Sequence, residues 1–113
     1  MNDCIFCKIA AGEIPSQKVY EDEQVLAFRD INPMAKVHIL VIPKTHIDRV
    51  AEITQEKAPL VAHIFTVIAK IAREQGLTEG FRVVSNCGPA AGQSVKHLHF
   101  HILGGQQLSL EMC

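Results

Sequence analysis

The sequence predicts a single α+β domain built around a largely antiparallel sheet. Its 113 residues suit one hydrophobic core. The periodicity of apolar residues gives the element order helix, strand, strand, strand, long helix, strand, strand. Helices and strands do not alternate regularly, and the early strands have short connections, which favours antiparallel pairing. No internal repeat or low-complexity segment divides the chain, so we expect one domain over residues 1–113.

The first part of the chain contains a short helix and three strands. Apolar residues at helical spacing predict the helix over residues 4–11, with Asp3 as its N-cap and Gly12 at its end. Two short strands follow around an acidic turn, and the β-rich segment HILVI predicts a central strand. These three strands span residues 18–21, 25–29 and 38–42. The intervening INPMA segment, residues 31–35, is a loop, because the residue before a proline disfavours helix.

The second part contains the long helix and two further strands. A one-sided apolar stripe predicts a helix over about residues 56–75, and Gly76 suits the left-handed position after its end. The stripe consists of Leu60, Ile64, Val67, Ile68 and Ile71. Strands over residues 81–85 and 96–103 then enclose the Gly/Pro-rich loop NCGPAAGQS, residues 86–94.

Composition and charge exclude several classes of function. Eleven Lys and Arg residues are scattered among twelve acids, and the net charge is −1, so no basic stripe for a nucleic-acid backbone exists. A ligand with one or two phosphates needs no such stripe. No apolar run approaches the roughly 18–20 residues of a transmembrane helix, and the N-terminus lacks the pattern of a signal peptide. We therefore expect a cytoplasmic protein with no membrane or nucleic-acid partner.

Three of the six histidines stand at alternating positions in the segment KHLHFHILGG. Side chains of a strand alternate between its faces, so His97, His99 and His101 should share one face. The opposite face, expected in the core, carries Leu98, Phe100 and Ile102. A merely solvated face would more simply use Thr, Lys or Glu, which makes the imidazoles functional candidates.

The residues alone leave two functions open for this histidine strand. A His-x-His pair can bind zinc through neutral imidazoles. Alternatively, one imidazole is a nucleophile toward phosphorus and the others orient it or contact an anion. The preceding loop favours the phosphate alternative, because it offers small residues, backbone N–H groups and neutral donors. These are Asn86, Gly88, Gly92, Gln93 and Ser94.

Cys4 and Cys7 form a second candidate site. Their Cys-x-x-Cys spacing is typical of a zinc knuckle, which would need two more ligands, and His46 and His97 are candidates. A redox pair is one alternative, although no βαβ context surrounds the motif, and a pair of unmetallated thiols is the other.

Several separated motifs, in order, resemble one known family. The run from His97 to Leu103 carries the signature of the histidine triad superfamily. The segments DCIFCKIAAGEIPS, VLAFRDINPMAKVHILVIPKTHI and GQSVKHLHFHILGG resemble its nucleotide-binding branch, the purine nucleoside phosphoramidases, over nearly all of residues 3–106. The resemblance implies a five-stranded antiparallel sheet with one long and one short N-terminal helix, and a homodimer in which the sheet continues across the subunits. It also implies binding of a purine nucleotide such as AMP or GMP.

The resemblance further implies a mechanism. His99 matches the nucleophile that attacks the α-phosphorus and forms a nucleotidyl-histidine, which water then hydrolyses. His101 matches the phosphate contact that helps to protonate the leaving group, and His38 matches a fourth histidine of the site. The matched phosphate and leaving-group contacts are Asn86, Gly92, Gln93 and Ser94. The matched nucleoside contacts are Ile5, Phe6, Ile9, Phe28, Asp30 and Ile31.

Some bacterial histidine triad proteins, and the related galactose-1-phosphate uridylyltransferases, carry a structural zinc ion. The positions that match its ligands are Cys4, Cys7, His46 and His97. By this resemblance His97 holds the metal while His99 and His101 are left for catalysis, which requires no metal.

Two other functions fit the same motifs. One is a dinucleoside polyphosphate hydrolase of the same superfamily, and the other is a non-enzymatic module that binds purine nucleotides. The chain contains no Trp, whereas eukaryotic members carry a Trp-Pro ending near the leaving-group pocket. The amine side of the substrate is therefore the least defined part of the prediction.

Overall fold

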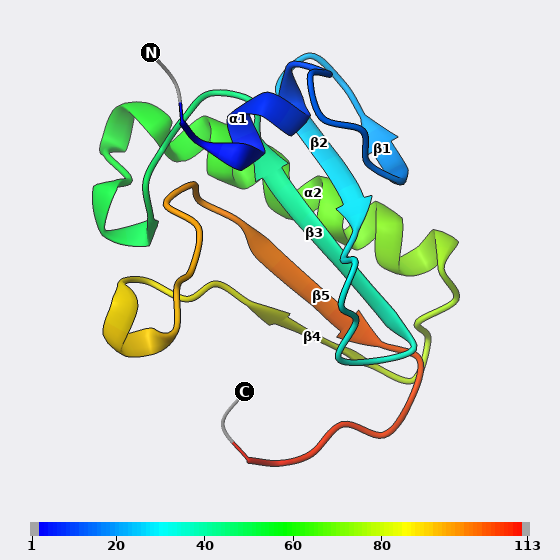
Figure 1. Cartoon of the computed structure of the whole chain (residues 1–113). Helices are drawn as coiled ribbons and strands as arrows, with labels where there is room; N and C mark the ends of the chain where they lie inside the picture. The colour runs from blue at the N-terminus through cyan, green and yellow to red at the C-terminus, as the bar shows by residue number, and fades with distance from the viewer. Residues whose placement is uncertain (1–2, 112–113) are drawn as a thin grey trace.

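A computed structural model describes residues 3–111 of the chain. Its centre is a five-stranded sheet in the order β1-β2-β3-β5-β4, in which every pair of neighbouring strands is antiparallel (Figure 1). The strands are β1 (Lys18–Glu21), β2 (Val25–Arg29), β3 (Val37–Pro43), β4 (Phe81–Val84) and β5 (Phe100–Gly104). The α+β class and the antiparallel sheet predicted from the sequence are thus confirmed.

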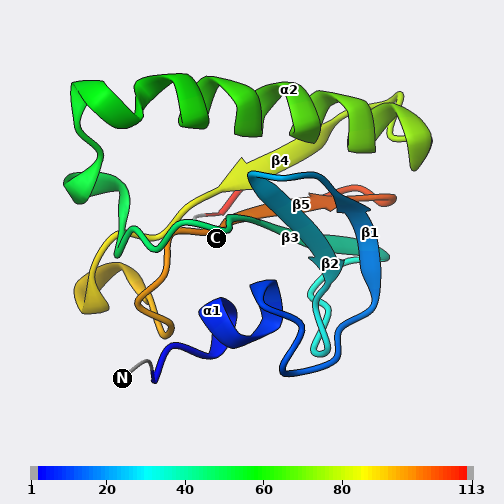
Figure 2. The same cartoon turned by 90° about the horizontal axis from the view of Figure 1, so that it is seen from above.

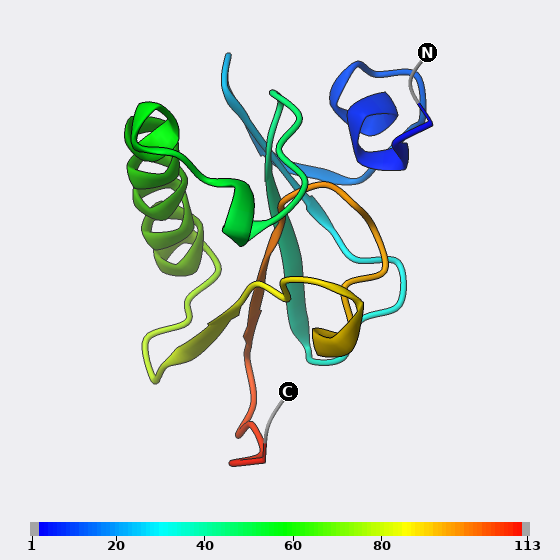
Figure 3. The ribbon, with the colours of Figure 1, turned by 90° about the vertical axis from the view of Figure 1, so that its left-hand side faces the viewer.

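Two helices lie on opposite faces of the sheet, α1 (Ile5–Ala10) on one side and α2 (Ala58–Glu74) on the other (Figures 2 and 3). Alternating residues of each strand supply the two cores. In β2, Val25 and Ala27 pack in the core that contains α2, whereas Leu26 and Phe28 pack in the core that contains α1. The sheet is therefore buried on both faces at its centre, and polar side chains there need partners.

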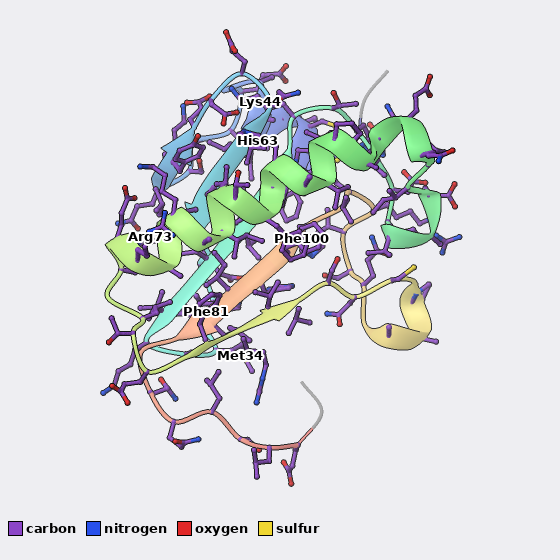
Figure 4. All side chains as sticks on the ribbon, turned by 180° about the vertical axis from the view of Figure 1, so that it is seen from behind. Met34, Lys44, His63, Arg73, Phe81 and Phe100 are labelled. Atoms are coloured by element: carbon purple, nitrogen blue, oxygen red, sulfur yellow. The ribbon has the colours of Figure 1, made fainter. Side chains whose placement is uncertain are left out.

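The structure of α2 confirms the apolar stripe predicted from the sequence. The side chains of Ile64, Val67, Ile68 and Ile71 are buried against the sheet, and Phe100 of β5 lies beneath the helix (Figure 4). Beyond Glu74 the backbone forms a Schellman motif: the N–H of Gly76 donates to Arg73 O at 3.1 Å and that of Leu77 to Ala72 O at 2.9 Å. Gly76 has φ +72°, the left-handed conformation that the sequence predicted for it.

The predicted N-cap of the first helix was wrong. Helix α1 begins at Ile5, and its N-cap is Cys4 rather than Asp3. Cys4 has an extended backbone, and its sulfur accepts a hydrogen bond from the Cys7 N–H at 3.3 Å. The Cys-x-x-Cys spacing therefore also closes the first turn of the helix.

The predicted last strand begins too early in the sequence. Strand β5 starts at Phe100, so His97 and His99 precede it. The β3–β5 ladder ends at the Val41–Phe100 pair although β3 continues to Pro43, because Pro43 O instead accepts the His97 Nε2–H at 2.8 Å and the N–H of Leu98 donates to Ile47 O at 2.6 Å. The alternation of faces still holds, because Leu98, Phe100 and Ile102 are all buried in the core under α2.

A polar contact joins the β1–β2 turn to α2. One oxygen of Asp22 accepts hydrogen bonds from Tyr20 at 2.8 Å and from His63 of α2 at 2.7 Å. His63 is labelled on α2 in Figure 4. No helix among residues 3–111 is long and apolar enough to cross a membrane.

Candidate active site and metal centre

Three histidines converge on the α1 side of the sheet, and we call them the histidine cluster: His38, His99 and His101. His38 lies on β3 opposite Leu103, and His101 lies on the neighbouring β5 opposite Leu40. The ring centroids of His38 and His101 are 5.1 Å apart, as are those of His99 and His101. Antiparallel register thus brings together residues more than 60 positions apart in the sequence.

The surroundings of His99 leave it with one free lone pair. Its Nδ1 lies 2.6 Å from the carbonyl oxygen of His97, which can only accept, so Nδ1 carries the proton. The ring of Phe6 meets the imidazole edge-on, with centroids 5.0 Å apart, and fixes its orientation. Burial lowers the pKa of His99, so the imidazole is neutral near pH 7 and its Nε2 is an unprotonated base or nucleophile.

His101 has the opposite tautomer, and a backbone amide determines it. The N–H of Met34 donates to His38 Nδ1 at 3.0 Å, which leaves the His38 proton on Nε2. That Nε2–H donates to His101 Nδ1 at 2.9 Å, so neutral His101 carries its proton on Nε2. The cluster therefore presents a neutral acceptor on His99 beside a neutral donor on His101.

The position of His101 makes the stability of the fold sensitive to acid. Burial, and then the positive charges that His99 and His38 would carry, lower the pKa of His101 to about 4. Its pKa in an unfolded chain is about 6.5. Between these two values the unfolded chain binds more protons than the folded one, so the free energy of unfolding falls as pH falls from about 6.5 to about 4.

We expect His101→Gln to weaken this acid sensitivity. The variant lacks the titrating group, so its loss of unfolding free energy between pH 7 and pH 4 should be about 1 kcal/mol smaller than that of the wild type, allowing for partial exposure of the ring. Urea unfolding followed by circular dichroism at both pH values measures the difference. Equal losses in the two proteins would show that His101 does not titrate as its burial indicates.

The residues predicted to contact a nucleoside fall into two groups. Phe6, Ile9 and Phe28 are buried and pack together in the core between α1 and the sheet. Ile5 and Ile31 are instead exposed, at 46% and 91% of their surfaces.

Asp30 lies beside the histidine cluster. Its Oδ1 accepts the Asn32 N–H at 2.8 Å, and its Oδ2 lies 3.4 Å from His38 Nε2. The carboxylate is thus fixed in direction, with one edge near the cluster.

The 86–94 loop begins beside the nucleophile candidate. Just before Asn86, the hydroxyl of Ser85 donates to His99 O at 2.8 Å. A turn of 3₁₀ helix, Pro89–Ala91, then reverses the chain between Gly88 and Gly92, both at φ +89°. Ser94 at the end of the loop is exposed, whereas the side chain of Gln93 is engaged with backbone groups.

The second candidate site brings together Cys4, Cys7, His46 and His97, whose ligand atoms all lie within 4.8 Å of one another. His97 Nδ1 is 3.2 Å from Cys4 Sγ and 3.4 Å from Cys7 Sγ, and His46 Nδ1 is 3.2 Å from Cys7 Sγ. Sulfur and nitrogen ligands of a tetrahedral zinc ion are about 3.5 Å apart, given usual bond lengths. The four groups can close on such an ion with small shifts.

The second nitrogen of each metal-site histidine supports this assignment. His97 Nε2 donates to Pro43 O at 2.8 Å, and His46 Nε2 donates to Asp48 Oδ1 at 2.6 Å. Both histidines therefore aim a lone pair on Nδ1 at the cysteines, as a zinc ligand with an outer acceptor does.

The positions of the imidazole protons also distinguish a third group of residues from the metal site. Asp30, His38 and His101 also lie close enough to hold a metal ion. However, the Met34 N–H occupies His38 Nδ1, so the His38 nitrogen that faces this group carries a proton. This tautomer suits hydrogen bonding within the histidine cluster rather than metal binding.

Sequence reasoning missed two groups of the site. Asp48, the partner of His46, is an acid two residues after a candidate ligand, a signal that was available in the sequence. The Met34 N–H left no signal, because any residue except proline supplies it.

Comparisons with known proteins agree with this fold. The HIT domain family matches residues 11–108. A solved histidine triad protein from Clostridium difficile has a TM-score of 0.95 at 57% identity, covering 99% of this chain and 98% of that one. A HIT family hydrolase from Legionella pneumophila has a TM-score of 0.94 at 45% identity, covering 96% and 97% of the two chains. A 14 kDa zinc-binding protein from Zea mays is 48% identical over 107 residues, covering 93% of this chain and 84% of that protein.

Proposed function

Because the chain belongs to the HIT domain family of the histidine triad superfamily, we propose that it is a nucleotide-binding hydrolase that cleaves purine nucleoside 5′-phosphoramidates. The relative from Legionella pneumophila is named a hydrolase. The observation that carries the proposal is the pair of opposite tautomers, with a free lone pair on His99 Nε2 beside a proton on His101 Nε2. Nucleophilic displacement of an amine needs these two groups together.

In the first step, His99 Nε2 attacks the α-phosphorus as the P–N bond breaks. The negative phosphoryl oxygens raise the pKa of His101 when substrate binds, so that its Nδ1 takes up a proton. The His38 Nε2–H, which donates to that nitrogen in the free protein, then turns to Asp30 Oδ2, 3.4 Å away. This imidazolium then donates its Nε2 proton to the leaving nitrogen, which departs as a neutral amine. The product on the protein is a nucleotidyl group on His99 Nε2, with Nδ1–H still donated to His97 O.

In the second step, water attacks the same phosphorus and the bond to His99 breaks. Neutral His101, now protonated on Nδ1, accepts a proton from the water on Nε2, and His99 leaves as a neutral imidazole. Release of the Nδ1 proton to solvent restores the resting tautomer and the hydrogen bond from His38. Two displacements give net retention of configuration at phosphorus.

The rest of the site binds and orients the nucleotide in this proposal. Asp30 holds the ribose hydroxyls, and Asn86, Gly92 and Ser94 contact the phosphate and leaving group. The apolar residues flank the base of AMP or GMP, and the exposure of two of them supports this role. They are Ile5, Phe6, Ile9, Phe28 and Ile31.

We assign a structural zinc ion to Cys4, Cys7, His46 and His97. The ion would supply a cross-link between α1, the segment after β3 and the segment before β5, because four protein ligands complete a tetrahedral shell. The maize relative named as zinc-binding supports this assignment. Catalysis is left to the histidine cluster.

We also propose a homodimer with a continuous sheet. Strand β4 lies at one edge of the sheet, where its outer hydrogen-bonding groups face outward. Phe81 of β4 and Phe65 of α2 are exposed at 40% and 47%, which supports an interface along that edge.

Trapping of the covalent intermediate tests the proposal. We expect mass spectrometry after rapid acid-free quenching to find a nucleotidyl adduct on His99 with an adenosine phosphoramidate, and steady release of AMP at a rate at least about tenfold above that with a diadenosine polyphosphate. Faster turnover of the dinucleotide would instead make the protein a dinucleoside polyphosphate hydrolase. Absence of turnover and adduct with both substrates, while AMP still binds, would identify a non-enzymatic nucleotide-binding module.

A further inference from the structure

The side chain of Gln93 is committed to the protein backbone. Its Oε1 accepts the Gly88 N–H at 2.8 Å, and its Nε2 donates to Asp48 O at 2.7 Å and to Val95 O at 2.9 Å. A glutamine amide has two N–H donors, and both are used here. The amide therefore ties the two ends of the 86–94 loop together and joins them to a segment about 45 residues away in the chain.

Asp48, at the far end of this link, also faces the metal site. Its carboxylate accepts the His46 Nε2–H at 2.6 Å, while its backbone carbonyl accepts from Gln93. Residues 46–49 belong to no helix or strand, so these contacts and the buried Ile47 hold the segment. A single residue thus contacts the metal site with its side chain and the loop with its backbone.

The metal site and the loop also border one hollow. A pocket of about 470 Å³ is lined by residues of both. Its wall consists of Asp3, Cys4, Ile5, His46, Asp48, Ser94, Val95 and Lys96. His46 and Asp48 of the metal-site segment thus line the same pocket as Ser94 and Val95 at the end of the loop.

We propose that Gln93 is a positioning residue, which couples the metal site to the phosphate-binding loop through Asp48. A metal ion on His46 Nδ1 polarises the imidazole and strengthens its Nε2–H donation to Asp48. The 46–48 segment is then fixed, and Gln93 transfers that order to Gly88 and Val95. Metal loading thereby sets the shape of the loop that receives the phosphate and the leaving group.

The coupling can be tested from the metal side, through the affinity of the protein for zinc. If metal loading orders the loop, then removing the Gln93 link must weaken metal binding, because coupling between two sites acts in both directions. We expect Gln93→Leu to raise the zinc dissociation constant by about 5-fold or more, measured by competition with a chromophoric chelator. We expect Asp48→Ala, which keeps the carbonyl but removes the His46 partner, to raise it by about 10-fold or more.

Amide hydrogen exchange measures the order of residues 86–94 directly and does not depend on catalytic activity. In the wild type, zinc removal should speed amide exchange across residues 86–94, measured by mass spectrometry. In Gln93→Leu the loop should exchange rapidly with and without zinc. Gln93→Glu keeps an oxygen for the Gly88 N–H but loses both donors, so it should also uncouple the loop from the metal.

Gln55→Leu, at an exposed position on a 3₁₀ turn, is the matched control and should retain wild-type zinc affinity and zinc-dependent exchange. Zinc affinity in Gln93→Leu equal to that of this control would overturn the coupling and leave Gln93 as a direct phosphate contact. Exchange of the wild-type loop that ignores zinc would overturn it equally.

The proposal rests on the proposed function only where it treats residues 86–94 as the phosphate-binding loop. AMP is the probe for that part: it should slow zinc release from the wild type, and should not slow it from Gln93→Leu. If AMP does not bind at all while zinc still orders the loop, the proposed function fails and the coupling stands. If AMP binds to the wild type without changing zinc release, the coupling fails and the proposed function stands.

Discussion

Replacement of His99 by glycine should abolish hydrolysis of an adenosine phosphoramidate. Loss of a nucleophile removes the covalent route altogether, and we expect kcat to fall by about 10⁴-fold or more. Binding should survive, because Asp30 and the 86–94 loop do not depend on the His99 ring for their own hydrogen bonds. The measurements are single-turnover release of AMP and the dissociation constant of AMP by calorimetry.

His63→Gly supplies the matched control for His99. It removes a histidine from the α2 side of the sheet, where the ring contacts Asp22 rather than the histidine cluster. Turnover in this variant should stay within about twofold of the wild type. If His99→Gly retained more than a tenth of wild-type turnover with AMP binding intact, then His99 would not be the nucleophile.

The second large effect concerns the metal site. In Cys4→Ser/Cys7→Ser, bound zinc measured by plasma mass spectrometry should fall from one ion per chain to a trace, because serine hydroxyls are poor zinc ligands. Loss of the cross-link between α1, His46 and His97 should lower Tm by about 10 °C or more, which corresponds to about 2 kcal/mol for a domain of this size.

Cys87→Ser tests whether any cysteine would give the same result. Cys87 lies in the 86–94 loop outside the metal cluster, so its replacement should leave both zinc content and Tm unchanged. Full zinc occupancy in the double variant would overturn the ligand assignment. Loss of zinc with an unchanged Tm would show that the ion does not stabilise the fold.

The sequence predicted the fold well because its signals are local. The stripe of α2 and the Gly76 cap were readable, since helix period and left-handed glycine leave marks in a single chain. The start of β5 was not readable. Alternation from Leu98 to Ile102 reports which face each side chain takes, but not that the ladder with β3 stops at Val41, before β3 itself ends at Pro43.

The side chains of the site could be predicted from the sequence, but the tautomers of its histidines could not. Histidine spacing placed His99 and His101 together, whereas His38 entered the prediction only through the family resemblance. Their tautomers, however, follow from the carbonyls of His97 and Pro43 and the amide of Met34, and backbone groups carry no residue-specific signal. The Asp48–Gln93 link depends on a tertiary contact across 45 residues, which no local pattern reports.

The amide that orients His38 has a consequence for how this site can be explored. Substituting Met34 by almost any amino acid leaves the same N–H in place, so a mutational scan or a library of variants would score the position as tolerant. Only proline deletes the donor. A position that accepts nearly every side chain can therefore still govern where the protons of the site reside, and a search for catalytic residues by side-chain replacement would pass over it.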